Sequence, residues 1–582
     1  MKIKTLITAA IIFAGIIAGI AARVDRPLEN DFPRGALIYA ETADLPGLID
    51  RVSGSEPLGA YTESRNYKEF TNRRLGLRLA ERIRDLSEGI GSSFDASFLK
   101  ALAEKRAAVA VYDIGQMDLV LIAPVKDSFF KASILLASQQ RLAEITTARG
   151  NTVYSLDVSL ENGRQKKKLM FALIEGRFVL ASSEKLLVKT EDIIAGRKQS
   201  GRLSDQDEFR KLADFGTDGL LRVWIDQKAL NSDYYYRRYW LARGDEDIAG
   251  VRSGMFSIEV KKGELIERRK YLLESPGPDR SIGAAASRSL AALVPDDAHF
   301  ASARTAGGSE AAAAVSITLF GDSAAERKRN EKLDLSDPGD FFELGGNYYG
   351  YEYLDSRFDQ KIDEQEEEVR TAGGDRERRE LSAMSRVLGG GNRTTLLEVL
   401  EPTPQPVPLF ADFRRGGAVL AGNRFDAPVF EESVKRLVTL NSGVSGVDLD
   451  LVWKKERIGK AEVRSLELPM LGRSFYYSKF PGGVAFSNSR ELIAEMLRKK
   501  KGGQKFAADP SLSSSAVINV GKGKDSFEAI FGRLNPDAKP DDLFKGNIAS
   551  LFGAFPDLDK VTAETRVQGQ FAEKSIVFHM PE

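Results

Sequence analysis

The sequence is short of the residues on which much protein chemistry depends. Its 582 residues include no cysteine and two histidines, His299 and His579. Disulfides, thiol catalysis, iron–sulfur clusters and lipid attachment through cysteine are therefore excluded. Two histidines alone cannot form a multi-histidine metal centre. We expect no cofactor and no bound metal.

An excess of charge of one sign is also lacking, since 84 Lys and Arg residues balance 84 Asp and Glu residues. A neutral chain has no whole-protein field that would attract nucleic acid, so we expect no nucleic-acid partner. Hydrophobic residues make up 42% of the chain, which is enough to fill sizeable cores and argues against global disorder.

What the sequence does contain begins with an apolar leader. Lys2 and Lys4 precede residues 6–22, which carry no charge. As a helix this run spans roughly 25 Å, slightly less than a bilayer's hydrocarbon core. We predict that residues 1–24 are a membrane anchor or, alternatively, a cleaved signal peptide. The early lysines place the body outside the cytoplasm, either anchored in the periplasm or extracellular space, or soluble in the periplasm after cleavage.

The body contains an internal repeat. Three pairs of segments with similar patterns occur in the same order: 32–40 with 294–301, 110–122 with 409–421, and 178–187 with 484–493. They indicate a turn before a strand, a β-hairpin, and a strand followed by a helix. We predict an α+β fold of two tandem related units, 32–274 and 292–582, joined by a turn-rich linker at 275–291. Each unit is expected to be an antiparallel sheet with helices packed on one face.

One segment departs from the repeat. Residues 354–384 of the second unit are strongly charged and include the acidic run 363–368. The spacing of apolar residues permits an exposed helix. We interpret the segment as a charged helical insertion, either a solvated helix or an interaction arm.

Two motifs could carry chemistry. Ser182 and Lys185 fit the S-x-x-K pattern of serine acyl-transferases. The second unit has Asn488 and Glu491 at the matching positions, so we favour a helix cap in both units. Asp113 and Asp412 occupy matching hairpin positions in our alignment, and we assign both to turns.

Two other features could form contact surfaces. The first interleaves aromatic and basic residues, which either pack internally or bind a partner: Tyr234, Tyr235, Tyr236, Arg237, Arg238, Tyr239 and Trp240. The second is a pair of basic loops after matching helices, which could meet anionic groups such as lipid phosphates: Arg197 and Lys198, and Arg498, Lys499, Lys500 and Lys501.

Four segments together resemble uncharacterised bacterial membrane-anchored or exported proteins of a domain-of-unknown-function family: the leader, residues 33–39, residues 295–298 and the aromatic segment 234–240. That resemblance implies duplicated α+β units and no established reaction. We expect an envelope-exposed, membrane-tethered binding or scaffolding protein whose partner is an envelope protein, glycan or lipid. Two alternatives remain: a carrier of lipid or another apolar ligand, and an envelope hydrolase or transferase using carboxylates or Ser182.

Overall fold

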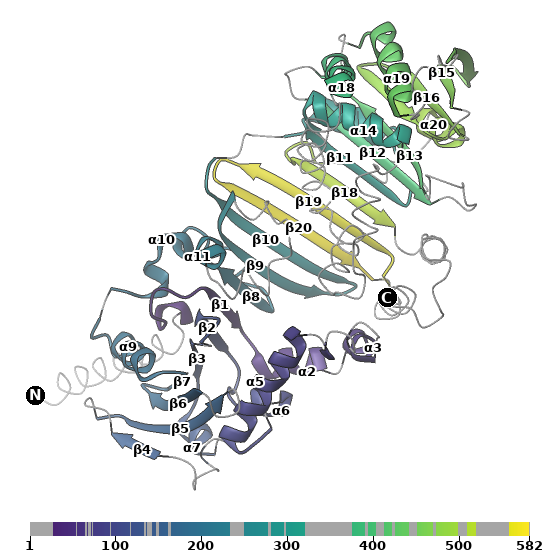
Figure 1. The fold of residues 1–582 in the computed structure, drawn as a ribbon. Coiled ribbons are helices and arrows are strands. Elements are labelled where there is room, and N and C mark those ends of the chain that lie inside the picture. Colours follow the sequence, from purple (N-terminus) through teal and green to yellow (C-terminus); the bar gives the residue numbers. More distant parts are fainter. Residues whose placement is uncertain are drawn as a thin grey trace, which may run out of the picture. The chain divides into compact units, whose positions relative to one another are not determined.

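The computed structural model describes an α+β protein with a large antiparallel sheet and helices (Figure 1). It describes residues 27–53, 55–63, 67, 71–72, 74–93, 95–116, 118–132, 136, 143–146, 150–160, 165–198, 200–232, 250–276, 281–295, 298–320, 375–389, 394–402, 413–421, 425–441, 451–468, 473–498, 509–519 and 558–580. The leader at 6–22, the aromatic segment at 234–240 and most of the predicted insertion lie outside these residues. None of the described helices is long and apolar enough to cross a membrane.

The chain divides into two compact units. The first comprises Met1–Glu63, Tyr67–Val260 and Glu267–Ser275, and the second comprises Ser64–Asn66, Lys261–Ile266 and Pro276–Glu582. We describe each unit by itself.

The strands of unit 1 pair in the order β4, β5, β6, β7, β3, β2, β1, β8, β9, β10. Their bounds are β1 Ile38–Thr42, β2 Ala107–Asp113, β3 Asp118–Pro124, β4 Ala143–Thr146, β5 Thr152–Leu160, β6 Gln165–Ile174, β7 Arg177–Ala181, β8 Leu221–Ile225, β9 Val251–Lys261 and β10 Glu264–Leu273. The helical elements are η1 Leu28–Asn30, α2 Leu45–Ser53, α3 Glu56–Glu63, α5 Arg74–Ile90, α6 Ala96–Lys100, α7 Asp127–Lys131, α9 Glu184–Ile194, η3 Leu203–Asp205, α10 Asp207–Arg210 and α11 Gln227–Ser232.

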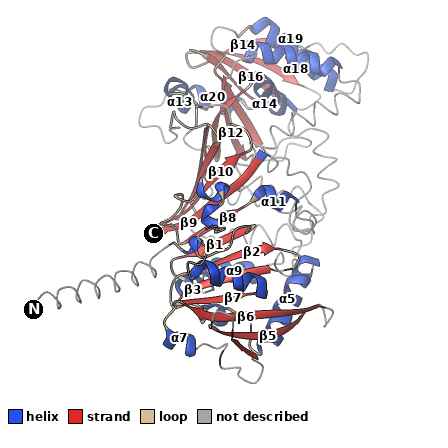
Figure 2. Cartoon of the chain, turned by 90° about the vertical axis from the view of Figure 1, so that its left-hand side faces the viewer, coloured by secondary structure: helices blue, strands red, loops and turns tan. Residues whose placement is uncertain are grey.

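Both faces of the unit 1 sheet are covered at β7, so the prediction of helices on one face is wrong there. All five residues of β7 are buried, whereas a strand covered on one face alternates buried and exposed residues. Phe178 packs with Phe130 of α7 in a core cluster on one face. Arg177, which points to the opposite face by strand alternation, pairs with Asp31 beside η1. Figure 2 shows α9 lying over β3 and β7.

The strands of unit 2 pair in the order β14, β15, β16, β17, β13, β12, β11, β18, β19, β20. Their bounds are β11 Phe300–Ala306, β12 Thr394–Pro402, β13 Phe413–Val419, β14 Trp453–Ile458, β15 Ala461–Leu468, β16 Arg473–Phe480, β17 Gly483–Ser487, β18 Ser514–Asn519, β19 Lys560–Gln568 and β20 Phe571–His579. The helices are α13 Ala284–Ala291, α14 Gly308–Phe320, α18 Asp375–Leu388, α19 Ala427–Asn441 and α20 Arg490–Leu497.

Unit 2 is also covered on both faces. Residues of α14, α18 and α19 form one core cluster with Val484 and Phe486 of β17. Residues of α20 form another with Ala485, the residue between them. Within α18, Met384 is fully buried. The part of the predicted charged insertion that the structure describes, from Asp375 on, therefore contributes to the core rather than projecting from it.

The two strand orders correspond position by position, with β1 in the place of β11 and β7 in the place of β17. The pairing, however, corrects our alignment of the hairpins. Ala110 lies opposite Val120, and Val399 lies opposite Gly416 at the same place in unit 2. The first strand of the second hairpin is thus β12. Residues 409–412, which we had aligned with β2, do not belong to β12 and lie outside the described residues. A gapless alignment failed because the connection after β12 is longer than the connection after β2.

Candidate functional site

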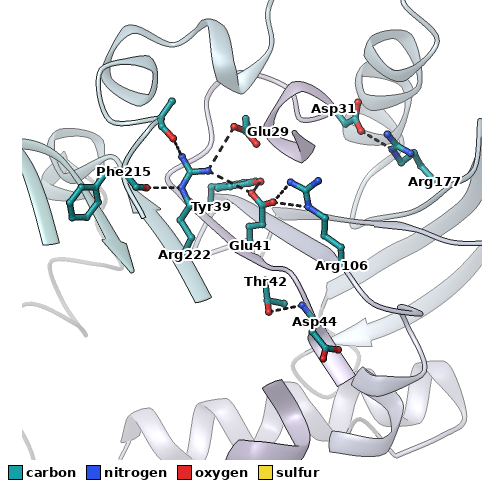
Figure 3. Close-up of polar contacts among 11 residues, drawn as sticks. Glu29, Asp31, Tyr39, Glu41, Thr42, Asp44, Arg106, Arg177, Phe215 and Arg222 are labelled. Carbon is teal, nitrogen blue, oxygen red and sulfur yellow. Dashed lines mark hydrogen bonds and ion pairs between the residues drawn. The ribbon is translucent and has the colours of Figure 1, made fainter. Parts of the chain in front are cut away.

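A cluster of buried charges lies on the η1 face of unit 1 (Figure 3). Glu41 of β1 is at its centre. One oxygen, Oε1, accepts a hydrogen bond of 2.9 Å from Nε of Arg106. The other, Oε2, accepts one of 2.7 Å from the hydroxyl of Tyr39 and lies 3.8 Å from Nη1 of Arg222. A carboxylate with these partners is stabilised although it is largely removed from water.

Arg222 of β8 joins this centre to the start of the described chain. Its Nη1 lies 3.8 Å from Oε1 of Glu29 in η1. Its Nε donates to the carbonyl oxygen of Phe215 at 3.1 Å, and its Nη2 donates to that of Ala213. The guanidinium thus contacts two carboxylates and two carbonyl groups. A planar cation with five N–H donors needs several such acceptors when it is buried.

Glu29 is the least satisfied member of the cluster. Burial raises the pKa of its carboxyl above the ordinary value of 4.5, and the neighbouring Glu41 raises it further. Its second oxygen, Oε2, is buried without a hydrogen-bond partner among the described residues. Glu29 therefore prefers the neutral form more than an exposed glutamate does.

A second buried ion pair follows two residues later. Oδ2 of Asp31 accepts a hydrogen bond of 2.9 Å from Nε of Arg177, at the start of β7. The two side chains are 0% and 2% exposed. Removing either partner would leave the other charge buried, so this pair fixes the segment to the sheet more firmly than a surface pair could.

The segment is also held by apolar packing. Leu28 and Phe32 are fully buried. Phe32 contacts Tyr39 edge to face at 5.3 Å, and Phe209 of α10 continues the series between Tyr39 and Trp224, at 5.7 and 5.4 Å between ring centroids. We call Glu29, Asp31, Arg177 and Arg222, with this packing, the N-terminal clamp.

This cluster is better suited to fixing the N-terminal segment to the sheet than to catalysis. Its charged groups bind one another and, apart from the partly exposed Arg106, are largely buried. Burial and the nearby Glu41 raise the pKa of Tyr39 well above its ordinary value. In unit 2, the strand at the place of β1 is β11, which pairs first through Phe300 as β1 pairs first through Ile38. Counted from these residues, the positions of Tyr39 and Glu41 are taken by Ala301 and Ala303. The Glu41 centre is therefore a feature of the unit that follows the leader.

Ser182 is built into the sheet rather than presented as a nucleophile. Its side chain is buried, and Oγ accepts a hydrogen bond of 2.9 Å from the backbone N–H of Leu119 in β3. Lys185 is exposed on the first turn of α9. In unit 2, Oδ1 of Asn488 accepts the corresponding bond, 2.8 Å long, from the backbone N–H of Arg415.

The predicted helix caps are wrong by one residue. The residue that caps α9 is Ser183, whose side chain makes no capping hydrogen bond. The residue that caps α20 is Ser489, whose Oγ accepts from the backbone N–H of Leu492. Ser182 and Asn488 instead satisfy a backbone donor of the neighbouring strand, which sequence spacing along one segment does not reveal.

The other titratable candidates have local structural contacts. Oδ1 of Asp113 accepts from the backbone N–H of Gln116 at 2.6 Å, as a turn-forming aspartate does. Nε2 of His579, the last residue of β20, lies 3.2 Å from Oγ1 of Thr562. His299 lies immediately before β11 and accepts from the backbone of Asn519 through its carbonyl oxygen. Asp412 is outside the described residues. Among the residues described, no three potential ligands come together as a metal site.

The structure places part of the basic loops. Arg197 is half-exposed, and its guanidinium lies 3.5 Å from Glu191 and 3.4 Å from Asp192 of α9. Lys198 is exposed, as is Arg498 at the end of α20. Lys499, Lys500 and Lys501, and the aromatic segment Tyr234–Trp240, lie outside the described residues.

Comparison with known proteins gives distant similarities to solved structures. No family model matches the chain, and no curated protein matches it. Among solved structures, crystal form III of TP0453, a Treponema protein, is similar to the chain with a TM-score of 0.24 and 11% identity, covering 47% of this chain and 88% of that one. Crystal form IV of TP0453 gives 0.24 and 10%, covering 42% and 80%. The resemblance to a bacterial domain-of-unknown-function family stays a prediction.

Proposed function

We propose that the chain is an exported protein, tethered to a membrane by residues 6–22, whose body works by binding or scaffolding in the cell envelope. The uncharged run and the two preceding lysines support export and orientation. The partner is an envelope protein, a glycan or a lipid.

The N-terminal clamp is the observation that supports a short tether between the leader and unit 1. Five residues, 23–27, separate the apolar run from Leu28, which is fully buried. Glu29 and Asp31 are then joined to β8 and β7 by ion pairs. With the leader in the membrane, a connection this short keeps unit 1 close to the membrane surface.

The scaffold part of the proposal includes duplication: we propose that the two units are related copies. The position-by-position agreement of the two strand orders supports this. The bonds of Ser182 to Leu119 and of Asn488 to Arg415 at the same corner add to it. Two similar units in one chain offer two similar surfaces, which suits a protein that brings partners together.

The tether can be tested on the full chain. We expect the protein to remain in membranes after alkaline carbonate extraction, with a mass that includes the leader. An Ile12→Lys, Ile16→Lys variant interrupts the apolar run at a cost of roughly 2.5–3.5 kcal/mol per lysine at mid-membrane, so it should be extracted. A wild-type chain that begins after residue 22 and is fully extracted would contradict the tether.

The binding role needs a separate test. Chemical crosslinking in intact cells, followed by pull-down from detergent extracts, should recover a recurrent envelope component with the full chain. Repeated recovery of the chain alone, from cells in which it is membrane-bound, would contradict binding while leaving the tether intact.

A further inference from the structure

We propose that the basic loop after α9, formed by residues 196–198 and 200–202, contacts anionic phospholipid headgroups at the surface of the membrane that holds the leader. This inference rests on the proposed function, because it requires an uncleaved leader. Of the two predicted basic loops, only the one in unit 1 is assigned to lipid, and its ligand is an anionic phospholipid headgroup.

The length of the tether limits how far this part of unit 1 can be from the membrane. Five residues, 23–27, can span about 17 Å when fully extended. The headgroup region on one side of a bilayer is itself roughly 5–8 Å thick. Leu28 and the segment that follows it must therefore stay within a short distance of the lipid surface.

The basic loop is joined directly to this segment. The backbone N–H of Arg34 donates to the carbonyl oxygen of Gly201 at 2.8 Å, and that of Leu203 donates to the carbonyl oxygen of Phe32 at 2.9 Å. An isolated β-bridge between Pro33 and Arg202 lies between these bonds. Because Phe32 is fully buried, the loop is held to the same rigid part of unit 1 as the clamp.

The charge of the loop suits an anionic surface. The loop contains Arg197, Lys198 and Arg202. Because Arg197 pairs with Glu191 and Asp192 of α9, Lys198 and Arg202 are the loop cations left for an anionic surface. Lys198 is exposed, as is Arg34 beside the loop. Cations within about 10 Å of an anionic bilayer act inside the Debye length, where attraction to lipid phosphates is least screened.

The absence of cysteine makes a direct test simple. The full chain carrying Ser200→Cys, at an exposed uncharged position of the loop, is labelled with a fluorophore and reconstituted through its leader into phosphatidylcholine vesicles, with or without phosphatidylglycerol, that contain headgroup-spin-labelled lipid. We expect quenching of the Ser200→Cys label, stronger with phosphatidylglycerol and weaker as salt rises. The matched control is Lys131→Cys in α7, on the opposite face of the unit 1 sheet and 71% exposed, where we expect at most half as much quenching.

A charge reversal separates contact by charge from simple proximity. With the label on Ser200→Cys, a further Lys198→Glu change should reduce quenching in phosphatidylglycerol vesicles, and Lys131→Glu should not. If the chain floats with the vesicles but Ser200→Cys is quenched no more than Lys131→Cys, the lipid contact is wrong and the tether stands. If the chain does not float with the vesicles at all, the tether fails and the inference fails with it.

Discussion

Changing Asp31 to asparagine should destabilise unit 1 strongly, because it leaves the Arg177 guanidinium charged and buried. The two side chains are 0% and 2% exposed and their atoms lie 2.9 Å apart. Breaking one side of a buried ion pair costs about 3–5 kcal/mol. For a unit of this size, each kcal/mol lowers the melting temperature by about 2–4 °C, so we expect a decrease of roughly 6–20 °C.

Differential scanning calorimetry of the full chain measures this shift in the transition that belongs to unit 1. The control is Asp50→Asn, which breaks the pair between Asp50 and Lys100, side chains 61% and 38% exposed. That change should cost less than about 1 kcal/mol. A double variant, Asp31→Leu with Arg177→Met, removes both charges and should lose less stability than Asp31→Asn alone. The reasoning is refuted if Asp31→Asn shifts the transition no more than Asp50→Asn does.

Three further changes test other contacts. Glu29→Gln should stabilise the protein at pH 7, because burial raises the pKa of Glu29 and the charged form then lowers the free energy of unfolding. In the wild-type protein this cost disappears as the pH falls below 4.5, where Glu29 is protonated in both the folded and the unfolded state. Urea titrations at several pH values should therefore show the unfolding free energies of the two proteins converging below pH 4.5. Ser182→Ala leaves the part-buried N–H of Leu119 without its acceptor and should cost about 0.5–1.5 kcal/mol in urea unfolding, while Ser182→Asn, which imitates Asn488, should cost less. Gly417→Ala places a Cβ 2.5 Å from the Phe486 ring and should cost about 1–3 kcal/mol, measured as a lower melting temperature of unit 2; an unchanged value would show that the ring yields freely.

Local sequence patterns predicted the elements that are locally determined. The segment at 178–187 forms β7 and α9, and the segment at 484–493 forms β17 and α20, since a strand, small polar residues and an amphipathic helix follow one another there. The antiparallel α+β class follows from such hairpins and helices. Burial of both sheet faces could also have been predicted, because Phe178 to Ala181 is a continuous apolar run rather than an alternating one.

The clamp could not be predicted in the same way. Asp31 and Arg177 are 146 residues apart in sequence, and with 84 acidic and 84 basic residues no pair stands out. A usable signal was the placement of Glu29 and Asp31 between Leu28 and Phe32, two large apolar residues that need burial. Acidic side chains drawn into a core require cations there, and the tertiary structure supplies Arg222 and Arg177 from distant strands.

An exported body that stays tethered can be detected through the accessibility of a single cysteine in living cells. With Lys131→Cys in the otherwise cysteine-free chain, a membrane-impermeant maleimide is added to bacteria whose outer membrane has been made permeable. We expect labelling before lysis, with the labelled chain in the carbonate-washed membrane fraction. Labelling that requires lysis, or a labelled chain recovered entirely in the soluble fraction, would contradict an exported body tethered by its leader.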